Sequence, residues 1–336
     1  MKISIIIPAW HEEKTIVRTL DALKQLNYSL KECELIIAAS IDDNTYSIAK
    51  GKSMPEFGRY LVLKQEPGGK NTALQQGIKE AKGDVLVLLD ADTIVERNWL
   101  KELTKIARQK DYATVDCLRF QIYKTFVTRY YAIREIKKRC IDKEHGCGGP
   151  SVLIKRKVID EIGIDVLFNK NVNVAVDALL TLELKKRGYK LGFCENTSLD
   201  TQIPPTLKEF VRDEIRWQNG VAQIMKKSEF FKILATYLTV FLSFLFTILS
   251  IFYFNSLFLV FYLILVSFIL KQAYTFAVVF NYTKNPYWKD FFPYLLLDLI
   301  SISIVSVVYM KILLFGGKKI THFKGYRPKG GNNENF

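Results

Sequence analysis

The stretch "VLVLLDADT" at residues 85–93 holds five aliphatic residues, followed by two aspartates that one alanine separates. A short apolar run of this length is typical of a buried strand. Aspartate is common in the turn after a strand, so the two carboxylates could simply cap the strand end. Side chains two positions apart leave an extended chain on the same face. Asp90 and Asp92 could therefore also form a metal or nucleotide site, and the rest of the chain has to decide.

Three aliphatic runs of similar length precede this stretch, at residues 3–9, 33–40 and 59–65. Each is followed by residues with helical spacing or helix-capping side chains. Runs that are apolar on both faces and alternate with short helices predict an α/β domain with a parallel sheet covered on both sides. Ligands of such sheets bind beyond the carboxyl ends of the strands. Four loops of polar or special residues fall at those ends, at 8–10, 40–44, 65–70 and 90–92.

Two common phosphate-binding motifs are missing from these loops. No G-x-G-x-x-G follows the first strand, which excludes the dinucleotide fingerprint. The segment "EPGGKNT" resembles a P-loop, but Lys64 stands at the first glycine position and Asn71 replaces the Ser or Thr after the lysine. Two carboxylates at a strand end suit Mg²⁺ or Mn²⁺, which could bridge them to a diphosphate. In a crevice without the other motifs, the spacing favours a metal site.

The C-terminal part of the chain is strongly apolar. Each of three segments, 233–254, 256–280 and 291–316, is long enough to span a bilayer, which takes about 20 apolar residues. The composition predicts about three transmembrane helices within 230–316 and a basic polar tail at 317–336. Lys271 and Asp298 interrupt the apolar region; we expect them to form an ion pair, with a role in handling substrate as the alternative.

The start of the chain lacks the pattern of a signal peptide, so we expect the N-terminal domain to be cytoplasmic and the protein to be a multi-pass cell-membrane protein. Three spans would then place the tail outside, whereas its basic residues favour the inside. The net charge of +14 is scattered and no nucleic-acid-binding motif accompanies it, so membrane lipids are the expected partners and nucleic acid is not. The five cysteines show neither a CxxC pair nor zinc spacing and are expected to be reduced.

Two segments resemble the family 2 glycosyltransferases, which are inverting enzymes of the GT-A fold that use nucleotide-sugar donors. "SIIIPAWHEEKTI" (4–16) is similar to their opening strand, and "GGKNTALQQGIKEAKGDVLVLLDADT" (68–93) to their central signature. The resemblance covers residues 3 to about 230. It implies a Rossmann-like GT-A nucleotide-sugar-binding domain, a UDP-sugar donor and Mg²⁺ or Mn²⁺ as cofactor. The implied donor-binding residues are Pro8, Ala9, Glu12, Asp43, Lys70 and Asp90, and the implied metal ligand is Asp92.

The opening part also departs from the family pattern. His11 replaces the usual Asn of the first motif. The aspartate that contacts the nucleotide base in the family falls on Ala39, so Asp42 or Asp43 would have to replace it.

Two downstream segments extend the resemblance. "VNVAVDALLTLELKKRGYKLGF" (172–193) is similar to the stretch whose Glu-Asp pair supplies the catalytic base. Val176 stands at the Glu position, and the resemblance assigns the base to Asp177, which could also serve as a helix cap. Membrane-bound members, such as cellulose and hyaluronan synthases and ceramide glucosyltransferases, carry Gln-x-x-Arg-Trp. Here the Gln is Asp213, while Arg216 would contact the diphosphate and Trp217 would stack on the acceptor or anchor the membrane interface.

These observations predict a cytoplasmic GT-A domain at 1–205, an amphipathic interfacial segment at 206–229 and the transmembrane region beyond it. The expected activity is transfer of a sugar to a lipid or lipid-linked glycan. A polyprenyl-phosphate monosaccharide synthase and a processive polysaccharide synthase are the alternatives within the class. A membrane scaffold without catalysis is a further alternative, because Ala39, Val176 and Asp213 replace family residues.

Overall fold

A computed structural model describes residues 1–109, 111–120, 125–141, 143, 145–172, 175–250, 259–283 and 291–315. The N-terminal part of these described residues is built on one eight-stranded sheet in the order β3-β2-β1-β4-β7-β6-β8-β5. The first four strands are β1 (Ile3–Ala9), β2 (Cys33–Ala39), β3 (Arg59–Lys64) and β4 (Val85–Leu89). The others are β5 (Ile94–Val95), β6 (Thr114–Phe120), β7 (Ser151–Lys155) and β8 (Leu191–Asp200).

The parallel arrangement predicted for the first four strands is confirmed, since β1 pairs in parallel with β2 and β4, and β2 with β3. β2 and β4 are buried along their whole length. Alternate residues of β1 enter different cores: Ile5 and Ile7 face helices α1 (Ile16–Lys24) and α4 (Trp99–Gln109), and Ile6 faces α3 (Lys70–Glu80). Burial on both faces explains why these strands read as continuous aliphatic runs.

The strand order reverses between β1 and β4. From β1 the chain moves outward through β2 and β3, and it then returns to the other side of β1 as β4. A parallel sheet opens a ligand-binding crevice at such a reversal, beyond the carboxyl ends of the strands. The loops that follow β1 and β4 are therefore the two walls of the predicted crevice.

The second half of the sheet is mixed. β7 runs antiparallel to β4 and to β6, while β6 and β8 are parallel. Helices α6 (Arg156–Ile162), α7 (Ile164–Leu167) and α8 (Val176–Lys186) lie on the face that α3 also covers, and α2 (Thr45–Gly51) packs beside β2 and β3. The predicted α/β fold is thus confirmed, but with an antiparallel strand beside the strand that carries the two aspartates.

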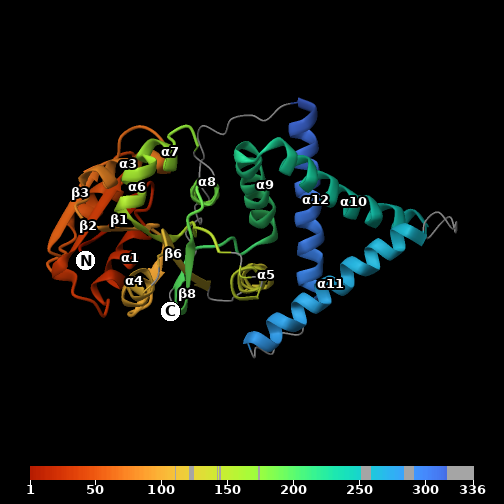
Figure 1. The fold of residues 1–336 in the computed structure, drawn as a ribbon, viewed down its shortest axis with the longest axis horizontal. Helices are drawn as coiled ribbons and strands as arrows, with labels where there is room; N and C mark the ends of the chain where they lie inside the picture. The colour runs from red at the N-terminus through yellow and green to blue at the C-terminus, as the bar shows by residue number, and fades with distance from the viewer. Residues whose placement is uncertain are drawn as a thin grey trace.

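The C-terminal helices lie at the opposite end of the molecule from the parallel strands (Figure 1). α5 (Phe126–Ile136) and α9 (Leu207–Ile224) lie between the sheet and helices α10 (Lys227–Ser250), α11 (Leu259–Thr283) and α12 (Phe291–Phe315). A short π-helical turn, Lys137–Ile141, continues α5. The buried residues of α9 are Phe210, Asp213, Glu214 and Gly220.

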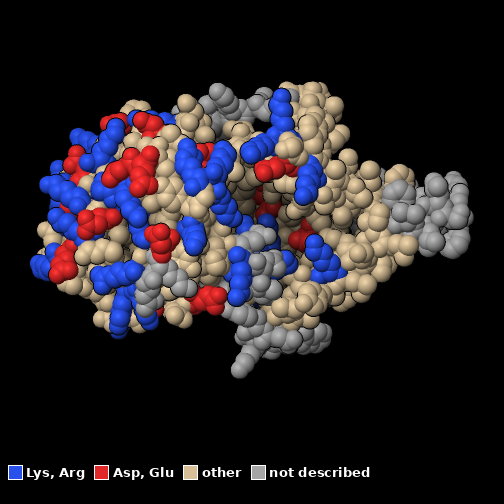
Figure 2. Space-filling model, viewed as in Figure 1, with Lys and Arg blue, Asp and Glu red and all other residues tan. Residues whose placement is uncertain are grey.

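Two stretches among the described residues, Tyr262–Val279 in α11 and Phe291–Phe315, are long and apolar enough to cross a membrane. Figure 2 shows charged side chains over the sheet end of the molecule and few on the surface of α10 and α11. The third predicted span, 233–254, runs past the end of α10 and its last residues lie outside the described residues, as does the tail at 317–336.

A buried polar network joins these helices to α5. Glu214 is fully buried and accepts hydrogen bonds from Arg134 Nη1 and Ser301 Oγ, both at 2.7 Å. Asp298 accepts one from the Tyr130 hydroxyl at 3.1 Å and one from Gln272 Nε2 at 2.7 Å.

The predicted Lys271–Asp298 ion pair is therefore wrong. Neutral donors from α5 and α11 satisfy the aspartate instead, and the side chain of Lys271 lines a separate groove.

Candidate functional site

The loops at the strand ends are joined by main-chain hydrogen bonds. The amide of Ser40 donates to the carbonyl of Ala9, and the amide of Gln65 donates to that of Ala39, each at 2.8 Å. The amide of Asp90 donates to the carbonyl of Pro150 at 2.8 Å. These bonds continue the strand ladders by one step, so that Pro8 and Ala9 at the end of β1 lie on the same rim as Asp90.

Lys70, the first residue of α3, connects two loops of this rim. Its Nζ donates to Asp90 Oδ1 and, at 3.1 Å, to the carbonyl of Gly149. Burial acts to lower the pKa of Lys70, but the negative charges of Asp90, Asp177 and Asp92 outweigh it and raise the pKa. The loop before α3 requires glycine at position 68, where φ is +145° and a Cβ would lie 2.3 Å from the Thr72 hydroxyl.

Asp177 lies beside this pair, as the second residue of α8. A methyl group built at Gly149 would lie 3.5 Å from Asp177 Oδ2, so the carboxylate adjoins the residue whose carbonyl binds Lys70. The Asp177 carbonyl accepts a hydrogen bond from Thr181 Oγ1, which in turn accepts one from the amide of Cys147, both at 2.8 Å. The helix that carries Asp177 is thus tied to the glycine loop of residues 146–149.

Asn71 fixes the chain that leads to α8. It is fully buried and its amide nitrogen donates to the carbonyls of Asn169 and Val172, both at 2.8 Å. This residue is the one that departs from the P-loop pattern, and here it joins α3 to the segment before Asp177. Its role was not predicted, because two main-chain partners about 100 residues away leave no local pattern in the sequence.

Two further acidic side chains, Asp92 and Glu12, lie within electrostatic range of Asp90. Burial, followed by the negative charge of Asp90, raises the pKa of Asp92 to about 7. Burial, followed by the charge of Asp92, raises the pKa of Glu12 to about 8, although a hydrogen bond from Thr15 opposes the shift. A cation bound beside these carboxylates would oppose both shifts.

The donor set fits a divalent cation that a diphosphate completes. Among the described residues, no group of three or more His, Cys, Asp or Glu side chains is arranged to hold a metal ion. Mg²⁺ is commonly held by one or two carboxylates together with substrate phosphates. Asp90 is engaged by Lys70, whereas the side-chain hydrogen bond that Asp92 accepts from Thr93 is long, at 3.4 Å. Asp92 is therefore the available ligand.

Asp43 shapes the loop before α2. Its carboxylate accepts hydrogen bonds from Ser40 Oγ at 2.7 Å and from the amide and hydroxyl of Thr45, and the Thr45 hydroxyl also accepts from the Glu12 amide. Burial acts to raise the pKa of Asp43, but these hydrogen bonds outweigh it and lower the pKa. With both carboxylate oxygens occupied, Asp43 links the first two loops of the rim.

Asp42 is the exposed neighbour. Its Oδ2 lies 4.0 Å from His11 Nε2, and 67% of its side chain is accessible. His11 adopts a left-handed backbone conformation with φ of 59°, which Asn and His tolerate better than most residues. This conformation gives a physical reason for a His at the family's Asn position. Of the two predicted replacements for the base contact at Ala39, Asp42 has the more exposed carboxylate.

Arg216 and Trp217 lie on α9. Arg216 Nε is 3.7 Å from Asp213 Oδ1, so the residue at the family's Gln position forms an ion pair with the arginine. Burial lowers the pKa of Arg216, while the charges of Asp213 and Asp177 act in the opposite direction. Trp217 packs edge-to-face on Tyr131 of α5 at 5.6 Å between ring centroids. Arg216 is thus within the electrostatic range of Asp177, and Trp217 is anchored beside it.

A second buried ion pair supports the glycine loop. Arg139 Nη2 lies 3.2 Å from Asp116 Oδ2, and Arg139 Nη1 donates to the carbonyl of Gly146 at 3.2 Å. A Cβ at Gly148 would lie 2.4 Å from an Asp116 oxygen, so only glycine fits there. Glycine at position 148 therefore serves internal packing against Asp116. A charged residue inside the apolar run at 114–120 was the available signal for Asp116.

Comparison with known proteins agrees with this geometry. A family model described as "Glycosyl transferase family 2" matches residues 4–163, and one described as "Glycosyl transferase family group 2" matches residues 85–279, more than half of the chain. The chain belongs to the family 2 glycosyltransferases. The predicted family and enzyme class are confirmed.

Two curated relatives resemble this glycosyltransferase over about the same region. A probable glycosyltransferase, YdaM, of Bacillus subtilis is 28% identical over 253 residues, which are 69% of this chain and 58% of the relative. The poly-beta-1,6-N-acetyl-D-glucosamine synthase of Staphylococcus aureus is 27% identical over 252 residues, 70% of this chain and 58% of that protein. The chain thus spans little more than half the length of these relatives.

Among solved structures, the mannosyltransferase PcManGT from Pyrobaculum calidifontis, in complex with GDP-Man and Mn²⁺, has a TM-score of 0.58. It is 17% identical, and the match covers 93% of this chain and 87% of that one. At this identity the likeness shows the fold, and it extends to the helices that follow the sheet.

Proposed function

We propose that this glycosyltransferase moves a sugar from a UDP-sugar to a lipid or lipid-linked glycan, with inversion at the anomeric carbon. One observation carries the proposal. Asp177 adjoins Gly149, the Gly149 carbonyl accepts a hydrogen bond from Lys70, and Lys70 pairs with Asp90 at the point where the strand order reverses. A carboxylate able to act as a base therefore lies next to the expected position of a donor diphosphate.

The roles of the side chains follow from this arrangement. Pro8, Ala9, Glu12 and Asp90 would border the nucleoside, with Asp43 holding the loop that presents Asp42 to the base. Lys70 and Arg216 would contact the diphosphate. Asp177 would remove the proton from the acceptor hydroxyl as its oxygen attacks the anomeric carbon. The bond from that carbon to the diphosphate breaks as the new bond forms, and the nucleoside diphosphate leaves from the opposite face, which inverts the centre in one step.

Asp92, with Asp90 beside it, would hold Mg²⁺ or Mn²⁺. The raised pKa of Asp92 and the Mn²⁺ in the PcManGT structure both support this assignment. When bound, the cation would offset the charge that develops on the departing nucleoside diphosphate. Omission of divalent metal should then reduce turnover and weaken donor binding.

The acceptor would reach the site from a membrane. Arg216 and Trp217 lie on α9, which packs against the apolar helix α12, so an acceptor held by membrane lipid would arrive beside them. In this proposal residues 1–205 form a cytoplasmic catalytic domain, 206–229 the interfacial segment and 230–316 a multi-pass membrane region, with a basic tail at 317–336.

The test is a kinetic comparison of Asp177→Asn with the unaltered protein, purified in detergent and supplied with a panel of UDP-sugars and Mn²⁺. We expect turnover to fall by about 10²- to 10⁴-fold, the usual contribution of a general base, with the donor Kd within twofold of the original value. Glu183→Gln is the matched control, because it removes a carboxylate of the same helix that pairs with Lys186 and Arg187. Unchanged turnover in Asp177→Asn would reject Asp177 as the base and favour a phosphate acceptor, which needs none.

A processive polysaccharide synthase is a second candidate, favoured by the relative named poly-beta-1,6-N-acetyl-D-glucosamine synthase. Mass spectrometry of the product separates the two, since single transfer adds one sugar and processive synthesis gives a ladder. If calorimetry detects no donor binding with or without Mn²⁺, the chain is a membrane scaffold that has kept the fold.

A further inference from the structure

Lys271 occupies an unusual position for a charged residue. It lies at the middle of α11, inside the apolar stretch Tyr262–Val279, and its side chain is exposed. Among the described residues, none forms an ion pair with it, and Asp298 is already engaged by Tyr130 and Gln272. A lysine within a membrane-spanning helix is costly unless it finds an anionic partner or water.

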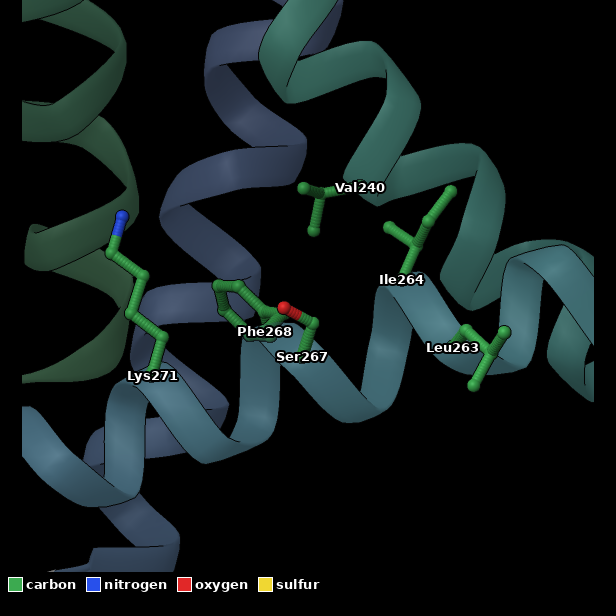
Figure 3. Close-up of a pocket in the computed structure, with 6 residues that line it drawn as sticks. All are labelled: Val240, Leu263, Ile264, Ser267, Phe268 and Lys271. Atoms are coloured by element: carbon green, nitrogen blue, oxygen red, sulfur yellow. The ribbon is translucent and has the colours of Figure 1, made fainter.

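The ammonium group of Lys271 lies at one end of a groove between α10 and α11 (Figure 3). The groove has a volume of about 420 Å³. On α11, the residues Lys271, Ser267 and Leu263 line the groove at four-residue spacing, so they lie on the same side of the helix. The remaining lining residues are apolar: Ile264 and Phe268 of α11 and Val240 of α10.

The polar end of the groove faces the catalytic domain. Gln272, the neighbour of Lys271, is linked through Asp298 to Tyr130 of α5. Two turns further along α11, Val279 packs on Ile136 of α5. Leu263 lies eight residues from Lys271 in the other direction, about 12 Å away along the helix axis. The groove is thus cationic next to the catalytic domain and apolar away from it.

We propose that this groove binds a membrane lipid through its phosphate. Lys271 and the Ser267 hydroxyl would contact the phosphate, and one hydrocarbon chain would lie along Ile264, Leu263 and Val240. Free phosphate would leave the apolar wall without a partner, and a neutral hydrocarbon would leave the lysine charge without one. Lipid binding is separable from the proposed transfer reaction, because it is measured without a donor sugar.

The test is native mass spectrometry of the full chain in detergent micelles, titrated with dioleoyl phosphatidylglycerol. Dioleoylglycerol, which has the same chains without the phosphate, and inorganic phosphate are the two comparison ligands. We expect Lys271→Gln to weaken phosphatidylglycerol binding about fivefold, the effect of one cation near a lipid headgroup. Lys271→Arg keeps the charge and should retain binding. Lys311→Gln is the matched control, since it removes an exposed lysine of α12 that lies outside the groove.

A second variant tests the apolar end. Val240→Trp would fill the groove and should remove one equivalent of bound lipid without changing the charge. The proposal fails if Lys271→Gln and Lys311→Gln bind phosphatidylglycerol equally, or if dioleoylglycerol binds as tightly as phosphatidylglycerol. Competition by millimolar inorganic phosphate would also reject a lipid as the occupant. Donor binding in the same samples shows whether each variant is folded, and it reports on the proposed function independently.

Discussion

The buried pair Arg134–Glu214 gives the sharpest test of how the catalytic domain is attached to its C-terminal helices. Glu214 of α9 is 0% exposed and accepts hydrogen bonds from Arg134 of α5 and Ser301 of α12. The Arg134 side chain is 38% exposed. Because only the carboxylate is buried away from water, removing Arg134 should cost more stability than removing Glu214.

Arg134→Met leaves a buried carboxylate without its cation and should lower the free energy of unfolding by about 3 kcal/mol. Glu214→Gln leaves a guanidinium that water still reaches, so the expected loss is smaller, about 2 kcal/mol. The double variant should recover part of the sum, with a coupling energy of about 1–2 kcal/mol. Arg134→Met is expected to lose more stability than Glu214→Gln because the carboxylate is buried and the guanidinium is partly exposed.

The assay is urea-induced unfolding in detergent micelles, followed by tryptophan fluorescence, for the four members of this cycle. Asp111 and Lys157 supply the control cycle, because their charges lie 3.9 Å apart with side chains 89% and 62% exposed. Their coupling should stay below about 0.5 kcal/mol. Additive effects at Arg134 and Glu214, or a larger loss in Glu214→Gln than in Arg134→Met, would refute the reasoning.

Three further outcomes are expected. Lys70→Met should weaken UDP binding about tenfold in calorimetry, because Asp90 loses its cation next to Asp92, whereas Lys79→Met at the exposed end of α3 should not; equal Kd values would contradict the assignment. Gly148→Ala should lower the free energy of unfolding by about 1–3 kcal/mol, since its Cβ would overlap Asp116, while Gly51→Ala meets open space; equal stability of the two variants would disprove the packing argument. The lowered pKa of Asp43 means that its hydrogen bonds stabilise the fold above the unfolded value near 4 and are lost as pH falls through the folded value. Asp43→Asn should therefore cost up to about 1 kcal/mol at pH 7 and progressively less as the pH falls below about 4; a pH-independent difference would count against it.

The first half of the fold and the family can both be predicted from the amino-acid sequence. The aliphatic runs at 3–9, 33–40 and 85–89 are buried on both faces, whereas the edge strand at 59–64 is half-buried. Burial on both faces requires a continuous apolar run, which the sequence shows directly. Parallel strands end at the same edge of a sheet, so the loops at their ends, including the two aspartates of "VLVLLDADT", are predicted to share one rim. The long apolar segments at the C-terminus can likewise be identified from their continuous apolar composition.

Which charged groups form pairs could not be predicted from the sequence and depends on the folded arrangement. Lys70 engages Asp90 and leaves Asp92 available, a division that the spacing of the two aspartates does not contain. The expected pair Lys271–Asp298 does not form, because Tyr130, 168 residues away, and Gln272 satisfy the aspartate. Arg139 with Asp116 and Arg134 with Glu214 were not predicted either. Such contacts depend on the distance between segments far apart in the chain and on how far their side chains are shielded from water. Neither quantity produces a repeating pattern of residues in the sequence.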